Sequence, residues 1–357
     1  LAGAKTTTFT SSQGLMLMLP NMYKIAGESL PTVFYVAART VATQALSIFC
    51  DYSDIYACMK TGFNIINCSS VQEVNDIAIA SEIASQRART PFICFFDGFR
   101  TSHELNTVYI SELEDVMKVA DLKDIANFKQ DALNNHNPVA HGTNQNPDVY
   151  MQSRVRAIER YQDVIEDVKY ALAKQAEITN RHYDTVEYYG DPNARDVVVA
   201  IGSACDVLML AKQQYKKKIG IIKVRLLKPF DEENFINKLP KNVRNITILE
   251  RNLDVNGVDT LTSFVLSALH KHNIKAQTYS GCYGLGGKEF TPDMAMSVFD
   301  NMMGRKKEFF TLGVYDNVTQ TNLEVKDRFV DNISDFSMRV YGPVSYTHLT
   351  LPTTSRV

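Results

Sequence analysis

Short apolar runs alternate with helix-like stretches along the first half of the chain. The runs have the length and the β-branched and aromatic content of buried strands, and they cover residues 31–38, 63–67 and 92–96. One helix is expected after the N-cap pair at 11–12, and a second through Leu46, Ile48 and Ala57. A third helix is opened by the capping box SVQE at 70–73. Strands that alternate with helices at this spacing predict a parallel sheet covered by helices.

A turn-rich stretch and a long helix separate this pattern from the second half of the chain. Residues 134–148 are rich in Asn and Pro and are not expected to form a regular element. A helix is predicted from about Tyr150 to His182, and it is too polar for a core element. We therefore expect an exposed surface helix that leads to a second domain.

The second half repeats the alternation of strands and helices. The turn at 191–193 is interpreted as the boundary, and the strands expected after it cover residues 196–202, 219–225, 246–250 and 274–279. Thr291 and Pro292 supply the N-cap and the first residue of a last helix. The fold class is therefore α/β, with two doubly wound domains at 1–182 and 183–342.

Both ends of the chain look unnatural. The segment from Leu1 to Lys5 resembles the end of a helix, so the native N-terminus is expected to be missing. Residues 343–357 change character abruptly and carry one charge, Arg356. We interpret them as a non-native tail that does not pack on the domains; the alternative is a natural Thr-rich terminus.

Composition narrows the class of protein. The chain has 357 residues, of which 45% are hydrophobic and 22% charged, as in a soluble globular protein of two domains. The 38 Lys and Arg against 40 Asp and Glu give a net charge of -2, which disfavours nucleic-acid binding. No apolar run is long enough to span a membrane. The six cysteines form no C-x-x-C pair, which is unlike a zinc ribbon or an iron–sulfur loop and is typical of a reducing compartment.

Candidate ligand residues follow the predicted strands, where open α/β sheets bind their ligands. The glycines at 281–287 do not have the dinucleotide spacing, so a role in backbone turns is favoured. His103 is interpreted as a hydrogen-bonded loop histidine, and nothing fixes the separation of Asp97 from Glu104. Arg39 follows a buried strand, where an unpaired guanidinium is costly. Either an internal carboxylate or an anionic ligand pairs with it.

Several blocks together resemble one enzyme family. They are TTTFTSSQG at 6–14, PNMYKI at 20–25, VAARTVAT at 36–43, FFDGFRTSHE at 95–104, QNPD at 145–148, KVR at 223–225, and YGLG with KEFTP at 283–292. The chain resembles the pyruvate:ferredoxin (flavodoxin) oxidoreductase family from Leu1 to about Gly342, and the block at 95–104 is the most specific. It departs from the family pattern at Gln44, Cys50, Tyr52, Cys282 and 249–257.

The resemblance implies an N-terminal fragment of a 2-oxoacid oxidoreductase. Its first domain would have the pyrimidine-type thiamine-diphosphate-binding fold, and its second would be like the transketolase C-terminal domain. The full-length enzymes are homodimers that convert pyruvate and coenzyme A to acetyl-CoA and CO2, and they reduce ferredoxin or flavodoxin. Their cofactors are thiamine diphosphate, Mg²⁺ and [4Fe-4S] clusters. They occur in cytoplasm, or in hydrogenosomes and mitochondrion-related organelles.

The resemblance also assigns a role to Arg39. The arginine of the family's A-R-T block binds the pyruvate carboxylate, and Arg39 matches it. The family's cofactor-binding glutamate would lie before Leu1, so no cofactor or metal ligand is assigned in this chain. The fragment alone is expected to be inactive. Two alternatives stay open: a fusion enzyme that reduces NADP, and a non-catalytic module of a related reductase subunit.

Overall fold

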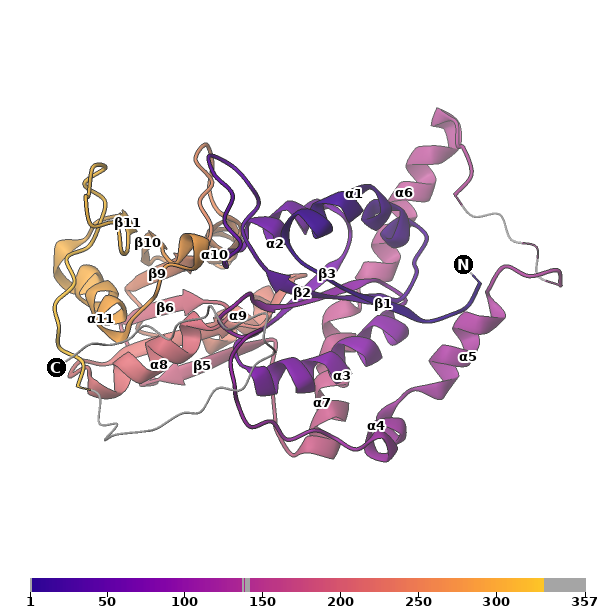
Figure 1. Cartoon of the computed structure of the whole chain (residues 1–357), viewed down its shortest axis with the longest axis horizontal. Helices are drawn as coiled ribbons and strands as arrows, with labels where there is room; N and C mark the ends of the chain where they lie inside the picture. Colours follow the sequence, from indigo (N-terminus) through magenta and orange to yellow (C-terminus); the bar gives the residue numbers. More distant parts are fainter. Residues whose placement is uncertain (1, 137, 139–141, 331–357) are drawn as a thin grey trace, which may run out of the picture. The chain divides into compact units, whose positions relative to one another are not determined.

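The computed structural model describes residues 2–136, 138 and 142–330. Two sheets lie within one unit, residues 1–327 (Figure 1). The first sheet has the strand order β1-β2-β4-β3-β8. Its strands are β1 (Thr6–Thr10), β2 (Thr32–Ala38), β3 (Asn64–Cys68), β4 (Phe92–Asp97) and β8 (Leu226–Lys228). β1 to β4 pair in parallel, and β8 is antiparallel to β3.

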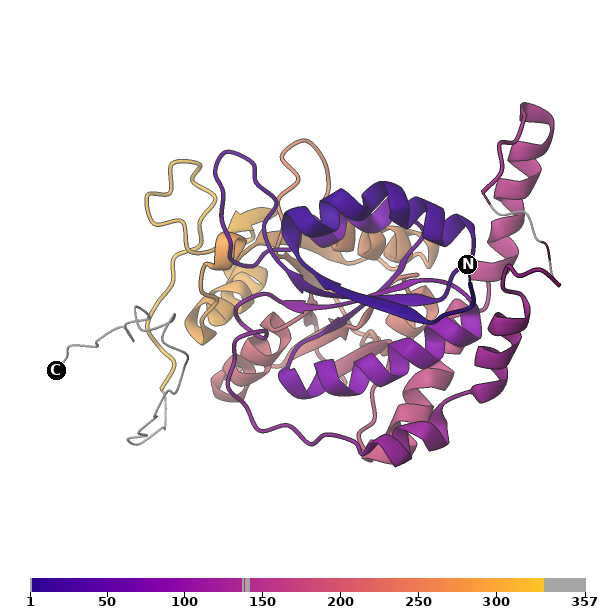
Figure 2. The same ribbon diagram turned by 45° about the vertical axis from the view of Figure 1, so that its right-hand side comes forward.

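Helices cover both faces of the first sheet, as predicted. Alternate residues of β2 point to opposite faces, because the side-chain period of a strand is two. Phe34 and Val36 pack with Leu15 of α1 (Ser12–Gly27), whereas Val33 and Tyr35 pack with Ile77 of α3 (Val71–Ala88). Figure 2 shows α1 on one side of the strands and α3 on the other.

The capping box at the start of α3 is confirmed in modified form. Ser70 accepts a hydrogen bond from the Glu73 backbone N–H at 3.2 Å. The Glu73 carboxylate returns to the N–H of Ser69 rather than Ser70, at 2.8 Å. The edge strand β1 was not predicted, because its run of threonines carries little hydrophobic signal.

The predicted helix through Leu46, Ile48 and Ala57 is wrong in its first part. Only α2 (Ser53–Ala57) is an α-helix, and a 3₁₀ turn, η1 (Cys58–Lys60), follows it. The backbone N–H of Thr40 donates to the carbonyl of Phe49 at 3.0 Å, which closes residues 40–49 into a loop. Leu46 and Ile48 are exposed, so their helical spacing does not reflect burial.

The long helix predicted from Tyr150 to His182 is two helices, α6 (Pro147–Tyr161) and α7 (Val164–Thr179). α6 has no buried residue, as expected of a surface helix. α7 packs along α3 and buries Val164, Val168 and Leu172, so the prediction of exposure is wrong for this half. Two short helices precede them, α4 (Leu113–Val119) and α5 (Leu122–Gln130).

The second sheet has the order β11-β10-β9-β6-β7-β5. Its strands are β5 (Val186–Gly190), β6 (Asp196–Ala200), β7 (Ile219–Val224), β9 (Asn245–Glu250), β10 (Gln277–Cys282) and β11 (Phe309–Thr311). All pairings are parallel except that of β5 with β7. The turn at 191–193 therefore connects two strands of this sheet and does not mark its start. The strand predicted from 274 begins at Gln277.

The helices of the second half are α8 (Ala204–Gln214), α9 (Glu232–Lys238), α10 (Thr260–Lys271) and α11 (Pro292–Asp300). Two short turns accompany them, η2 (Leu285–Gly287) and the π-helical η3 (Asn301–Arg305). Thr291 caps α11 as predicted, because its hydroxyl accepts from the Met294 N–H at 3.2 Å. The α/β class is thus confirmed for both halves.

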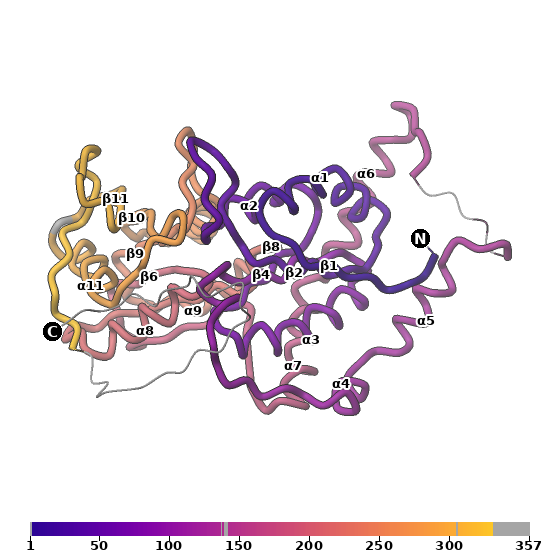
Figure 3. Tube along the Cα trace, in the orientation of Figure 1, coloured from indigo at the N-terminus to yellow at the C-terminus, as the bar shows by residue number. Residues whose placement is uncertain are grey.

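Several contacts join the two sheets. β8 follows β7 in sequence but pairs with β3 in the first sheet. The Asn67 side chain donates to the carbonyls of Val224 and Arg225 at 2.7 and 2.8 Å, and it accepts from the Gly202 N–H at 3.0 Å. Tyr52 N–H donates to the Arg251 carbonyl at 2.9 Å, which holds the loop before α2 beside the loop after β9 (Figure 3). The carboxyl ends of strands from both sheets therefore lie together.

Two sequence expectations are not addressed by this architecture. The suspected tail, residues 343–357, lies outside the described residues. The division into domains at 182 and 183 stays a prediction. Within the described part of the chain, every helix is too short or too polar to span a bilayer.

Candidate substrate site at the carboxyl ends of the strands

Asp97, the last residue of β4, connects three segments of the chain. Its side chain is fully buried. Tyr52 donates its hydroxyl to Asp97 Oδ1 at 2.6 Å, and Arg251 Nη1 lies 2.8 Å from Oδ2. Ser203, at the start of α8, donates both its N–H and its hydroxyl to the same oxygen. Asp97 therefore holds the strand ends of both sheets together.

Asp97 and Glu104, whose separation the sequence did not fix, lie in different surroundings. Glu104 is exposed and accepts a hydrogen bond from Asn106 at 3.2 Å, whereas Asp97 accepts hydrogen bonds from Tyr52, Ser203 and Arg251. The two carboxylates do not form a pair. His103 is a hydrogen-bonded loop histidine, as expected, with Nδ1 at 2.8 Å from the Ser102 hydroxyl.

Arg39 lies directly after β2, and its guanidinium stacks on an aromatic ring. Its Cζ is 4.6 Å from the centre of the Phe99 ring. Its Nε is buried and has no hydrogen-bond partner. Among the described residues no carboxylate forms an ion pair with the Arg39 side chain. The described residues therefore do not provide the internal carboxylate that was one of the two partners expected for Arg39.

Asp54 holds the backbone of Arg39 in place. The Asp54 carboxylate is fully buried on α2, and its Oδ2 accepts the N–H of Arg39 at 3.0 Å and that of Ser12 at 2.8 Å. Burial raises the pKa of Asp54 to about 7, although the bonds from Arg39, Ser12 and Ile55 lower it in part. The end of β2 and the start of α1 are therefore tied to one side chain.

A strained turn presents the Phe99 ring to Arg39. Phe99 has φ of 61°, which is uncommon for a bulky residue. Gly98 before it passes so close to β2 that a Cβ would lie 2.4 Å from the Ala38 carbonyl oxygen. The Phe99 ring also contacts Phe49 at 4.8 Å and stacks on His103 at 4.6 Å between ring centres. These contacts hold one face of the ring against the guanidinium.

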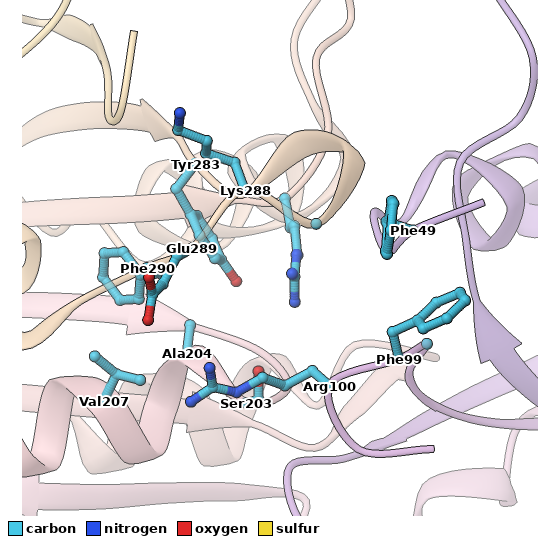
Figure 4. Close-up of a pocket in the computed structure, with 13 residues that line it drawn as sticks. Phe49, Phe99, Arg100, Ser203, Ala204, Val207, Tyr283, Lys288, Glu289 and Phe290 are labelled. Carbon is cyan, nitrogen blue, oxygen red and sulfur yellow. The ribbon is translucent and has the colours of Figure 1, made fainter. Parts of the chain in front are cut away.

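A cavity of about 280 Å³ opens beside this turn, between the ends of β4, β6, β9 and β10 (Figure 4). Its polar walls include Arg100, Ser203, Arg251, Tyr283 and Glu289, and its apolar walls include Phe49, Phe99, Val207 and Phe290. Arg39 does not line the cavity.

The glycines at 281–287 form turns, as the sequence favoured. Gly284, Gly286 and Gly287 have φ of 68°, 59° and 75°, which a side chain would strain. The Gly284 carbonyl accepts from Arg251 Nε at 3.1 Å, and the Gly287 N–H donates to the Cys50 carbonyl at 2.8 Å. The turns therefore position the wall of the cavity.

Sequence reasoning identified Arg39 but missed Tyr52, Asp54, Arg251 and Tyr283. Tyr52 stood out only as a departure from the family pattern, and an acidic residue in the first turn of a helix is ordinary. No metal centre was assigned from the sequence. Among the described residues no three His, Cys, Asp or Glu side chains form a group that could hold a metal ion.

Two protein-family descriptions match the chain. "Pyruvate flavodoxin/ferredoxin oxidoreductase, thiamine diP-bdg" matches residues 1–171, and "Pyruvate:ferredoxin oxidoreductase core domain II" matches residues 194–295. A solved structure of 2-oxoglutarate:ferredoxin oxidoreductase from Magnetococcus marinus, with 2-oxoglutarate, coenzyme A and succinyl-CoA bound, aligns with a TM-score of 0.56 at 19% identity. It covers 85% of this chain and 54% of that one, and it supports the fold alone.

Curated relatives match most of the chain. Pyruvate:ferredoxin oxidoreductase from Moorella thermoacetica is 46% identical over 331 residues, which cover 91% of this chain and 28% of the relative. Pyruvate-flavodoxin oxidoreductase from Enterobacter agglomerans is 41% identical over 93% of this chain and 29% of its own length. The chain thus spans less than a third of these two relatives. A Nostoc pyruvate-flavodoxin oxidoreductase is 41% identical over 92% of this chain and 82% of the relative. The chain belongs to the pyruvate flavodoxin/ferredoxin oxidoreductase family.

Proposed function

We propose that this chain is part of an enzyme that oxidatively decarboxylates pyruvate with coenzyme A. The products would be acetyl-CoA and CO2, and the electrons would pass to ferredoxin or flavodoxin. The observation that carries the proposal is the Arg39 guanidinium, which stacks on Phe99 but lacks an ion-pair partner among the described residues. Arg39 lies within residues 1–171, which match the thiamine-diphosphate-binding family description, and relatives with this activity in their names match more than nine-tenths of the chain.

In this proposal Arg39 binds the carboxylate of pyruvate. A guanidinium can donate two parallel hydrogen bonds to a carboxylate, which fixes the orientation of the adjacent keto carbon. Arg39 moves no proton, because arginine stays charged at working pH. Phe99 supports one face of the guanidinium and Asp54 holds its backbone, so the group is positioned before substrate arrives.

The cofactors of this reaction are part of the proposal. The matched family description names thiamine diphosphate binding, and thiamine diphosphate, when bound, supplies the nucleophilic carbon for decarboxylation. A guanidinium without an ion-pair partner among the described residues, as at Arg39, suits the carboxylate of pyruvate. The described residues offer no group for a metal ion, so we assign none of them to Mg²⁺, to the diphosphate or to a [4Fe-4S] cluster. We further propose a homodimer in the cytoplasm, with the hydrogenosome or a mitochondrion-related organelle as the alternative.

NADP is a second candidate acceptor. A relative named pyruvate dehydrogenase [NADP(+)], from Cryptosporidium parvum, is 40% identical over 346 residues that cover 92% of this chain. The flavodoxin-named relatives are 39–42% identical to the chain, so similarity of this segment does not separate the acceptors.

The test uses the full-length protein that contains this chain. Purified without oxygen and supplied with thiamine diphosphate and Mg²⁺, it should reduce methyl viologen only when both pyruvate and coenzyme A are present. Acetyl-CoA and CO2 should form in equal amounts. Ferredoxin, flavodoxin and NADP are then compared as acceptors. A folded, cluster-loaded protein without pyruvate-dependent reduction would show that the chain serves as a non-catalytic module.

A further inference from the structure

The cavity beside Phe99 contains a buried hydroxyl that has no hydrogen-bond partner. Tyr283 follows β10 and is 2% exposed, and its hydroxyl is unpaired. Figure 4 shows its ring extending into the cavity, opposite Arg100 and Ser203. An unsatisfied buried hydroxyl is costly, so a bound group that accepts a hydrogen bond from it is favoured.

Two guanidinium groups line the same cavity. Arg251 is 6% exposed, and its Cζ lies 5.9 Å from the centre of the Tyr283 ring. Its Nε donates to the Gly284 carbonyl and its Nη1 to Asp97, so neither of these contacts uses Nη2. Arg100 enters from the end of β4, and within the described part of the chain no carboxylate pairs with it. The cavity thus combines a fixed guanidinium with a free one.

The lining is cationic overall. Arg100, Arg251 and Lys288 carry positive charge, and Glu289 is the acidic lining residue. The Lys288 ammonium lies 4.3 Å from the centre of the Tyr315 ring, and Figure 4 shows it directed away from the cavity. Asp97, outside the lining, neutralises Arg251. Arg100 is therefore the cation that remains for a ligand.

The donors follow three different strands, which come from both sheets. Arg100 follows β4, Arg251 follows β9 and Tyr283 follows β10. A planar carboxylate is best matched by one guanidinium in its plane, whereas a tetrahedral oxyanion can accept from several sides. We propose that this cavity binds a phosphate group, as free phosphate or as a phosphate ester. The site is separate from Arg39, and the proposal does not depend on the proposed reaction.

The competing explanation is an internal ion pair. Glu289 lines the same cavity as Arg100, and in this explanation the two side chains pair with each other. In that case the cavity would need no anion, and the folded chain would show no saturable phosphate binding.

The test titrates inorganic phosphate into the 357-residue chain by calorimetry at constant ionic strength. We expect one phosphate per chain. Tyr283→Phe removes only the hydroxyl and should weaken binding about tenfold, the typical effect of one hydrogen bond to a charged group. Arg100→Gln should weaken it at least as much. Tyr279→Phe is the matched control, because Tyr279 lies on β10, the strand that Tyr283 follows, is 2% exposed and also has an unpaired hydroxyl, but it lines a different cavity.

Thermal unfolding of each variant shows that it is folded before binding is compared. Phosphate binding that Tyr283→Phe weakens and Tyr279→Phe leaves unchanged supports the site. Equal effects of the two substitutions, or no saturable binding by the folded chain, would overturn it. Acetate is titrated in parallel, and acetate binding as tight as phosphate would refute the assignment to phosphate.

Discussion

Arg225 and Glu73 form a buried ion pair between the two halves of the chain. Arg225 Nη1 lies 2.7 Å from Glu73 Oε2, and the arginine side chain is fully buried. Glu73 also pairs with Lys223, and Arg225 also pairs with Glu187 at 3.0 Å. Burial alone would raise the pKa of Glu73, but the charges of Arg225 and Lys223 outweigh it and lower the pKa to about 2. One carboxylate therefore caps α3 and joins it to β7.

Replacement of Arg225 should destabilise the chain strongly. Arg225→Ala would leave Glu73 with Lys223 alone and Glu187 without its buried partner, and loss of one member of a buried pair costs about 3–5 kcal/mol. Urea denaturation at pH 7 measures the change in the free energy of unfolding. The control is Arg156→Ala, because Arg156 is exposed and 4.0 Å from Glu159, and its effect should stay within about 0.5 kcal/mol. Similar small effects of both substitutions would contradict the prediction.

The stability of the chain should fall as the pH rises from about 4.5 to about 7. Glu250 is 1% exposed, and burial raises its pKa to about 7, although bonds from Tyr56 and Thr262 lower it in part. A carboxyl whose folded pKa exceeds its unfolded value binds more protons when folded, so its ionisation weakens the fold. At pH values above the folded pKa, the free energy of unfolding has fallen by its full amount, on the order of 3 kcal/mol. Asp54 acts with the same sign in a similar pH range.

Glu250→Gln separates the contribution of Glu250 from that of Asp54. The amide oxygen can accept the bonds that Thr262 now donates at 2.7 and 2.9 Å, and the amide nitrogen can donate to the Tyr56 hydroxyl. The variant should match the original chain near pH 4.5, be more stable at pH 8, and retain the slope caused by Asp54. Glu159→Gln, at an exposed position, should leave the pH profile unchanged. A stability that is flat from pH 5 to 8 in the original chain would refute this assignment.

The central strands of both sheets could be predicted from the sequence because their burial follows directly from local composition, whereas the edge strands β1, β5, β8 and β11 were not predicted. β7 consists mostly of apolar residues and β9 is half apolar, and almost every position in both strands is buried. Residues 46–57 show the limit of this approach, because apolar residues at helical spacing there lie partly in an exposed loop. α7 shows the opposite case, since its mixed composition conceals a face that packs on α3. In both segments, burial depends on which distant parts of the chain pack against them, and a local sequence pattern does not show this.

A residue of the candidate site could be predicted where its type and its position in the sequence alone indicated the need for a partner. An arginine directly after a buried strand needs an anion, and this identified Arg39. Glu73 was recognised as a cap, but its partners Lys223 and Arg225 lie about 150 positions away and nothing local marks them. Tyr283 was noted only as part of the YGLG block, because an unpaired hydroxyl becomes visible only when the surrounding chain is folded.

The 357-residue chain alone should not bind thiamine diphosphate with micromolar affinity. The diphosphate of such a cofactor needs a metal ion or helix N-termini, and the described residues hold no group for a metal ion. Calorimetry with thiamine diphosphate and Mg²⁺ should show no saturable heat with this chain, whereas the full-length protein should bind the cofactor. Saturation at micromolar concentration with the 357-residue chain would refute the expectation and would place the whole cofactor site within it.

Substitution of Arg39 in the full-length protein should reduce activity far more than stability. Arg39→Ala removes both the charge and the paired geometry, and a hydrogen bond to a charged group is worth about 1.5–3 kcal/mol, so two bonds predict a loss of roughly 10²-fold or more in kcat/KM. Arg39→Lys keeps the charge but not the planar guanidinium, and its kcat/KM should lie between that of the original protein and that of Arg39→Ala. Pyruvate-dependent reduction of methyl viologen measures the kinetics, and the melting temperature is recorded on the same preparations.

The melting temperature decides between the two explanations for Arg39. The Arg39 guanidinium stacks on the Phe99 ring, so Arg39→Ala should lower the free energy of unfolding by only about 0.5–1 kcal/mol. An arginine paired with a protein carboxylate would instead cost about 3–5 kcal/mol when removed. Arg87→Ala is a suitable control, because Arg87 also stacks on an aromatic ring, that of Tyr170 at 4.2 Å, but it lies on α3 and pairs with Asp167. It should leave kcat/KM unchanged. A large fall in melting temperature with near-normal kcat/KM in Arg39→Ala would mean that Arg39 supports the fold and does not bind pyruvate.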